Sequence, residues 1–214
     1  MAEEVLAALK PRPGGCYADG TVGGAGHAAA MLGASSPTGW LFGCDRDGAA
    51  VEAAGRQLAQ FAGRFELRRE NFAELASWVP ASSCDGVLLD LGVSSPQLDT
   101  AGRGFSFQQD GPLDMRMDTR QALTAAALVN EASADELAKI FWELGGERDA
   151  RRFARAIARE REQRRIQTTR QLAELIERLS PRHGKQAHPA TKVAVPTDTM
   201  NIVIFFIESF LVQR

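Results

Sequence analysis

The alternation of apolar and polar stretches in the first hundred residues predicts parallel strands joined by helices. Runs with strand character occur at residues 16–19, 40–44, 65–68 and 86–91. A short, continuous apolar run such as 40–44 is typical of a parallel strand that is buried on both faces. Helical patterns are expected at 3–9, 27–32 and 48–61, with Asp47 as a cap for the last of them. This order predicts a doubly wound α/β sheet.

Beyond residue 99 the pattern changes from strands to helices. Residues 99–120 have neither strand nor helix periodicity, so they predict a long loop, and such loops inside compact domains are usually functional. Three amphipathic helices follow: one opened by a capping box at Ser133, one over 148–163, and one opened at Thr168. They predict a small helical domain inserted after the fourth strand.

The chain is therefore divided into a nucleotide-binding core (1–100), a loop with a helical insert (101–192) and an apolar tail (193–214). A bilayer-spanning helix needs ~20 apolar residues, and the apolar run of the tail is shorter and is interrupted by Glu208. A strand or a buried helix is expected there, with no membrane partner. The acidic first residues do not resemble a signal peptide, which favours a cytoplasmic protein.

Composition adds a charge asymmetry to this picture. The chain has 214 residues, 44% of them hydrophobic, and a net charge of −2, which by itself predicts no nucleic-acid partner. Residues 148–185, however, contain twelve basic and five acidic side chains. Such a local excess can follow a phosphate backbone, although a solvated helix face remains the alternative. The three cysteines have no metal-site spacing and predict buried, reduced thiols and no metal.

A glycine-dense bend follows the first strand, in the segment Asp-Gly-Thr-Val-Gly-Gly-Ala-Gly-His at 19–27. Glycine lets a ligand approach the main chain closely, and a carboxylate at the end of the next strand, Asp45, can bind a ribose. The spacing is not that of the dinucleotide fingerprint, and no P-loop Gly-Lys-Ser/Thr follows. An adenosylmethionine cofactor is therefore favoured over NAD or ATP. A structural turn and, more weakly, a nicotinamide dehydrogenase are the alternatives.

Polar residues also follow the fourth strand, where open α/β sheets bind ligands. They are Asp90 and the Ser94-Ser95-Pro96 turn. The loop after them mixes aromatic, acidic and arginine residues without periodicity, which is poor core material and suits a substrate-facing loop. Arginines there can meet phosphates, and phenylalanines can stack on bases.

Five segments carry a further signal: 19–27, 45–47, 88–99, 103–107 and 110–118. Together they resemble one family, the bacterial 16S ribosomal RNA cytosine-N4 methyltransferases of the MraW or small-subunit methyltransferase H type. The resemblance runs from about residue 4 to residue 192. It implies a Rossmann-like sheet, S-adenosylmethionine as the methyl donor, and a cytosine amine in the decoding centre of 16S rRNA as the acceptor.

The resemblance also implies roles for particular residues. Its cofactor positions fall on Ala25, Gly26, His27, Asp45, Phe72, Asp90 and Gln97. We expect the proton of the amine to be taken up by the segment that contains Asp90, Ser94, Ser95 and Pro96. The candidates for RNA contact are Arg103, Phe105, Phe107, Arg116, Arg152 and Arg155.

The chain departs from the family pattern at its C-terminal end. Residues 193–214 match no family motif, whereas the family continues into a last set of strands. This predicts a truncated sheet with an open edge. The alternative to an active enzyme is then an inactive remnant or an RNA-binding module of the same family.

Overall fold

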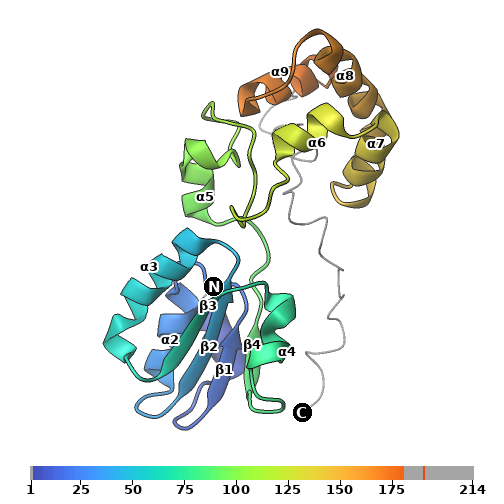
Figure 1. The fold of residues 1–214 in the computed structure, drawn as a ribbon. Coiled ribbons are helices and arrows are strands. Elements are labelled where there is room, and N and C mark those ends of the chain that lie inside the picture. The colour runs from blue at the N-terminus through green and yellow to red at the C-terminus, as the bar shows by residue number, and fades with distance from the viewer. Residues whose placement is uncertain (1, 181–189, 191–214) are drawn as a thin grey trace. The chain divides into compact units, whose positions relative to one another are not determined.

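The computed structural model describes residues 2–180 and residue 190 of the chain (Figure 1). The chain forms two compact units that divide between Ser94 and Ser95. The sequence placed this boundary after residue 100. The tail predicted at 193–214 lies outside the described residues.

The first unit is an α/β sheet in which every strand pair is parallel. The strands are β1 (Cys16–Asp19), β2 (Trp40–Asp45), β3 (Phe65–Arg69) and β4 (Gly86–Leu88), in the order β3-β2-β1-β4. The helices around the sheet are α1 (Ala2–Leu9), α2 (Gly26–Ala34), α3 (Gly48–Leu58) and α4 (Leu75–Trp78), with short 3-10 turns at Ala59–Phe61 and Phe72–Glu74. The predicted α/β fold is confirmed, and β4 is shorter than the predicted strand.

The strand order creates a place for a ligand. β1 lies between β2 and β4, and Asp19 is in register with Gly43 of β2 and Leu88 of β4. The chain therefore runs to one side of β1 for the next strand and later returns to its other side. In open α/β sheets, ligands bind outside the carboxyl ends of the strands at such a reversal. The bend after Asp19 begins at this point.

Buried side chains from the strands and helices hold this sheet together. Tyr17 of β1, Leu41 of β2 and Met31 of α2 are each at most 1% exposed. α3 begins where the sequence predicted, because the Asp47 carboxylate accepts a hydrogen bond from the Ala49 N–H at 3.0 Å.

The second unit is helical in its regular part. Its helices are α5 (Ser95–Asp99), α6 (Ala125–Glu131), α7 (Ala134–Glu143), α8 (Ala150–Gln163) and α9 (Thr169–Leu179), with a 3-10 turn at Ala101–Arg103. The capping boxes predicted for α7 and α9 are both present. The sequence missed α5 and α6, which are too short for a clear apolar stripe. Among the described residues, no helix is long and apolar enough to cross a bilayer.

The loop between α5 and α6 belongs to the core of the second unit. Phe105, Leu113 and Met115 are buried at 9%, 1% and 2% exposure, in the same hydrophobic cluster as the residues of α7–α9. The Leu113 N–H donates a hydrogen bond to the Gln167 carbonyl at 2.8 Å, which connects the loop to the segment directly before α9. The expectation that this loop is poor core material is therefore wrong. Turns separate its apolar side chains, so these side chains do not recur at a regular spacing in the sequence.

Candidate functional site

The bend between β1 and α2 leaves open space beside its main chain. Ala25, directly before α2, has φ +65°, a left-handed conformation that glycine adopts without cost. A Cβ added at Gly24 or Gly26 would meet no heavy atom of the described structure within 4 Å. Packing therefore does not require glycine at these two positions. The open space is what close approach of a ligand needs.

Asp45 lies against this bend, as the sequence predicted. Its Oδ2 accepts a hydrogen bond from the Gly23 N–H at 2.9 Å, and its Oδ1 accepts one from the Asp47 N–H at 2.9 Å. Burial raises the pKa of the carboxyl, and these two N–H donors partly offset that rise. Each carboxylate oxygen can accept a second hydrogen bond. Binding of a ribose by Asp45 stays a prediction.

Asp19 is an acidic residue of the site that the sequence reasoning missed. It ends β1, is only 1% exposed, and accepts a hydrogen bond from the Thr21 N–H at 3.0 Å. Burial raises its pKa to about 6, against the opposing effects of the Thr21 N–H and of His27. Its position at the end of a strand, like that of Asp45, was a signal that could have identified it.

A cavity of about 310 Å³ lies beside the end of β4. Its lining consists of Glu4, Val5, His27, Leu88, Leu89 and Asp90. The His27 Nε2 is 3.7 Å from the Asp90 Oδ2, and the buried His27 Nδ1 has no hydrogen-bond partner among the described residues. The Asp90 N–H donates to the Thr21 Oγ1 at 2.7 Å, which holds the chain after β4 against the bend.

Phe72 lies next to the start of the bend. A Cβ added at Gly20 would be 2.7 Å from the Phe72 Cβ and would also contact the Leu89 side chain. The structure therefore brings Phe72 and the bend together within the first unit. Stacking of its ring on an adenine stays a prediction, and packing in the core is the alternative.

The predicted catalytic segment spans the boundary between the two units. Ser94 ends the first unit, whereas Ser95 and Pro96 begin α5 of the second. Gln97, predicted to bind the cofactor, is buried in the second unit at 7% exposure. Their predicted roles stay predictions.

Two of the predicted RNA-binding arginines hold the loop together. The Arg103 Nη2 donates to the Arg116 carbonyl at 2.9 Å. The Arg116 guanidinium pairs with the Asp114 carboxylate through contacts of 2.7 and 2.8 Å and also donates to the Gln121 carbonyl. Both groups are thus engaged by oxygen atoms of their own loop.

The aromatic candidates are also placed differently from the expectation. Phe105 is buried in the core of the second unit, and the Arg103 guanidinium lies 5.7 Å from the centre of its ring. Phe105 thus packs in this core, and stacking of its ring on a base stays a prediction. Phe107 is partly buried against the same core, and its predicted role stays a prediction.

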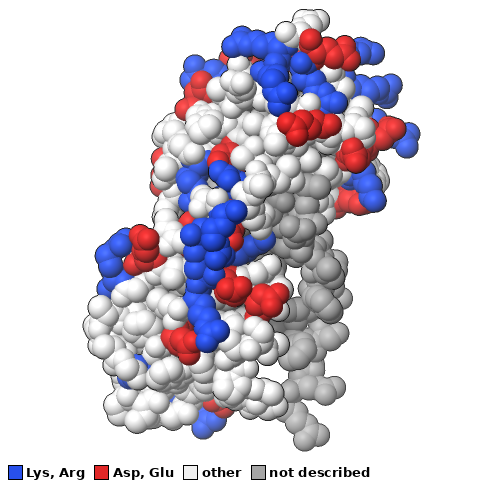
Figure 2. Space-filling view, in the orientation of Figure 1, with Lys and Arg blue, Asp and Glu red and all other residues white. Residues whose placement is uncertain are grey.

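Arg152 and Arg155 lie on the exposed surface of α8. The Arg152 Nη2 donates to the Leu179 carbonyl at 2.6 Å, and the Arg155 Nε donates to the Arg151 carbonyl at 3.1 Å. Figure 2 shows many Lys and Arg side chains gathered over α8 and α9. In the described part of the chain, no group of three or more His, Cys, Asp or Glu side chains could hold a metal ion.

Comparison with known proteins identifies the family. A sequence model described as the MraW methylase family matches residues 1–195. The chain belongs to this family.

Several curated relatives carry the description "Ribosomal RNA small subunit methyltransferase H". Those of Syntrophotalea carbinolica and Geotalea daltonii are 54% and 50% identical to this chain, and that of Symbiobacterium thermophilum is 49% identical. Each alignment covers 90% of this chain and 62–63% of the relative. The chain thus spans a little under two thirds of the length of these relatives.

Proposed function

We propose that this chain is the cofactor-binding and RNA-recognising part of a methyltransferase that acts on the N4 amine of a cytosine in the decoding centre of 16S rRNA. The observation that carries the proposal is the edge of the sheet in the first unit. There the open glycine bend lies beside the strand-end carboxylates of Asp19 and Asp45, at the reversal of strand order, and Asp90 lies near His27. Membership of the MraW methylase family and the names of its curated relatives support an rRNA substrate.

The residues of the bend and of the strand ends fit S-adenosylmethionine. Gly24 and Gly26 leave space for an adenosyl group at the main chain, and Asp45 presents carboxylate oxygens beside them. The unpartnered His27 Nδ1 is a buried polar atom that a ligand can satisfy. Asp19 adds a buried acidic group, which favours a cationic ligand such as a sulfonium. When bound, the cofactor supplies an electrophilic methyl group.

Asp90 is the residue best placed to handle the proton of the reaction. The exocyclic amine of cytosine is a weak nucleophile because its lone pair is delocalised into the ring. It becomes reactive when an acceptor holds its N–H and receives a proton as the new N–C bond forms. The Asp90 side chain is 51% exposed and lines the cavity, so its carboxylate can reach a base from outside. The Thr21 hydroxyl holds the Asp90 main chain in place.

The test is methyl transfer to ribosomal particles. Small subunits from a bacterial strain that lacks this methylation are incubated with the chain and S-adenosylmethionine labelled in the methyl group. We expect label in a cytosine of 16S rRNA, at a rate that falls at least about tenfold in Asp90→Asn, because the carboxylate accepts the proton.

Two other results would revise the proposal. If both this chain and a longer relative bind the cofactor and neither transfers a methyl group, the chain is better explained as a binding module without turnover. Methylation of small molecules but not of small subunits would exclude an rRNA substrate.

A further inference from the structure

A second cavity lies in the helical unit, between α7 and α8. It has a volume of about 690 Å³, and its residues come from α7, from α8 and from the turn between them. Its apolar part includes Ala138 and Ala150, which are small and buried at 9% and 3% exposure. Trp142 of α7 also lines it and is 60% exposed, although tryptophan is usually largely buried. Small side chains next to an exposed indole leave room for a flat ligand.

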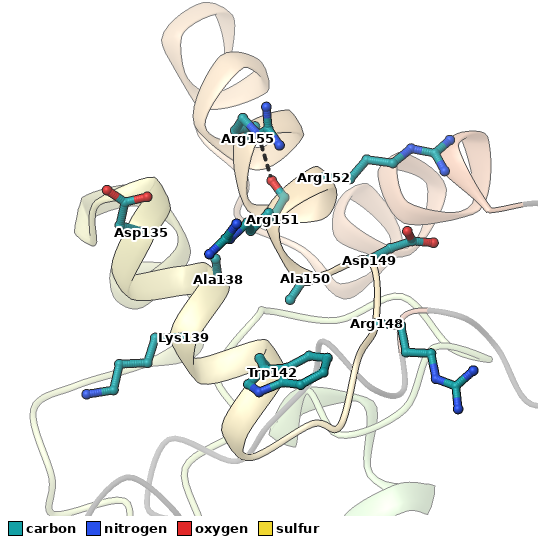
Figure 3. Close-up of a pocket in the computed structure, with 10 residues that line it drawn as sticks. All are labelled: Asp135, Ala138, Lys139, Trp142, Arg148, Asp149, Ala150, Arg151, Arg152 and Arg155. Atoms are coloured by element: carbon teal, nitrogen blue, oxygen red, sulfur yellow. Dashed lines mark hydrogen bonds between the residues drawn. The ribbon is translucent and has the colours of Figure 1, made fainter.

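Basic residues line the cavity together with this indole (Figure 3). In this view Trp142 lies between Lys139 and Arg148, and the Arg151 guanidinium lies near Ala138. Lys139, Arg148 and Arg151 are exposed and form no ion pair with any described residue.

The basic side chains outnumber the acidic ones around the cavity. The basic lining residues are Lys139, Arg148, Arg151, Arg152 and Arg155, and the acidic ones are Asp135 and Asp149. Arg152 points away from Trp142 toward α9, where it binds the Leu179 carbonyl. The cavity thus combines an aromatic face with an excess of positive charge.

We propose that this cavity, here called the Trp142 groove, binds single-stranded RNA by stacking one base on the indole and by placing the adjoining phosphates against Arg148 and Arg151. The inference rests on the proposed rRNA substrate and adds a binding site separate from the cofactor pocket. An aromatic side chain stacks on any base, and arginine pairs with phosphate, so this combination is typical of single-strand recognition. The positive charge disfavours a basic partner, such as a second copy of the α8 surface.

The test uses the whole 214-residue chain and a fluorescein-labelled single-stranded RNA of about 12 nucleotides, a length within the usual site sizes. Stacking of one base contributes ~1–3 kcal/mol, so Trp142→Ala should weaken binding roughly 5- to 150-fold in fluorescence anisotropy. Trp142→Phe should restore most of the affinity. Because Trp142 is largely exposed, neither change should disturb folding, which circular dichroism can verify.

The proposed phosphate contact is tested by a variant that removes one positive charge from the groove and by a control variant that removes one elsewhere. Arg151→Gln should weaken RNA binding and reduce the slope of log affinity against log salt by about 0.7, the value for one phosphate contact on a single strand. Arg56→Gln removes the same charge from an exposed position on α3 and should leave the slope unchanged.

The outcomes separate this inference from the proposed function. Suppose that the wild type binds the cofactor and transfers methyl groups, and that Trp142→Ala has an unchanged affinity for RNA. This result would overturn the proposed RNA site and leave the proposed function in place. Loss of self-association in Trp142→Ala, with RNA affinity unchanged, would overturn it in favour of a contact between two copies. RNA affinity that depends on Trp142 supports the groove, even where no methyl transfer is found.

Discussion

Replacement of the buried Asp19 by asparagine should make the protein more stable at neutral and alkaline pH. The Asp19 carboxyl is 1% exposed, and among the described residues only the Thr21 N–H and hydroxyl are close hydrogen-bond donors. Asparagine has nearly the same shape, and its Oδ1 can accept the same N–H hydrogen bond. The substitution therefore removes a buried charge while it keeps the local geometry.

The magnitude follows from the shift in pKa. Folding raises the pKa of Asp19 from an ordinary 3.8 to about 6, so ionisation costs the folded state about 3 kcal/mol once the pH exceeds 6. Below about pH 4 the carboxyl is protonated in both the folded and the unfolded state, and this cost vanishes. Relative to Asp19→Asn, the wild type should therefore lose stability as the pH rises from about 4 to about 6. The difference should stay constant above that range.

Urea unfolding at a series of pH values measures this difference. We expect equal free energies of unfolding near pH 4 and an advantage of about 3 kcal/mol for Asp19→Asn at pH 8. Asp99→Asn, at an exposed position, is the control and should change the free energy of unfolding at pH 8 by less than about 0.5 kcal/mol. An Asp19→Asn variant that is no more stable than the wild type at pH 8 would refute the reasoning.

Four further substitutions test the packing and the hydrogen bonds of the two units, each by urea or thermal unfolding. Gly20→Ala should destabilise the first unit by about 1–3 kcal/mol, because its Cβ would overlap neighbouring side chains, whereas Gly24→Ala has free space and should cost less than about 1 kcal/mol. Asn130→Ala should cost about 1–3 kcal/mol, because the Asn130 amide bonds both the N–H and the carbonyl of Ile166. Thr168→Ala should cost about 1 kcal/mol, because it removes the cap of α9. Equal stability of Gly20→Ala and Gly24→Ala, or no loss in either of the other two variants, would contradict these assignments.

The sequence predicted those features that depend on local patterns. The four strands, the Asp47 cap and both capping boxes of the helical unit have short-range signatures, and all are present. The proximity of Asp45 to the bend was also predictable, because parallel strands end at the same edge of a sheet.

The features that the sequence did not predict depend on contacts between distant segments. Phe105 and Met115 are core residues because the loop packs against helices α6–α9, which follow later in the chain. Arg116 was predicted to contact phosphate, and nothing in the sequence indicated that it also bonds Asp114 and the main chain of its own loop. The Trp142 groove exists because two alanines from different helices meet beside one indole. A linear pattern contains no direct signal for such pairings.

The central claim is that the glycine bend of the first unit binds S-adenosylmethionine. Calorimetric titration of the wild-type chain and of Gly26→Ala with this cofactor tests the claim most directly. The Cβ of the variant enters open space, and alanine suits the first turn of α2, so thermal stability should be unchanged or slightly higher. We predict one bound cofactor per wild-type chain and an affinity at least about tenfold lower in Gly26→Ala, because the methyl group occupies the space that the ligand needs. Absence of binding to the wild type, or equal affinity in the two proteins, would contradict the account.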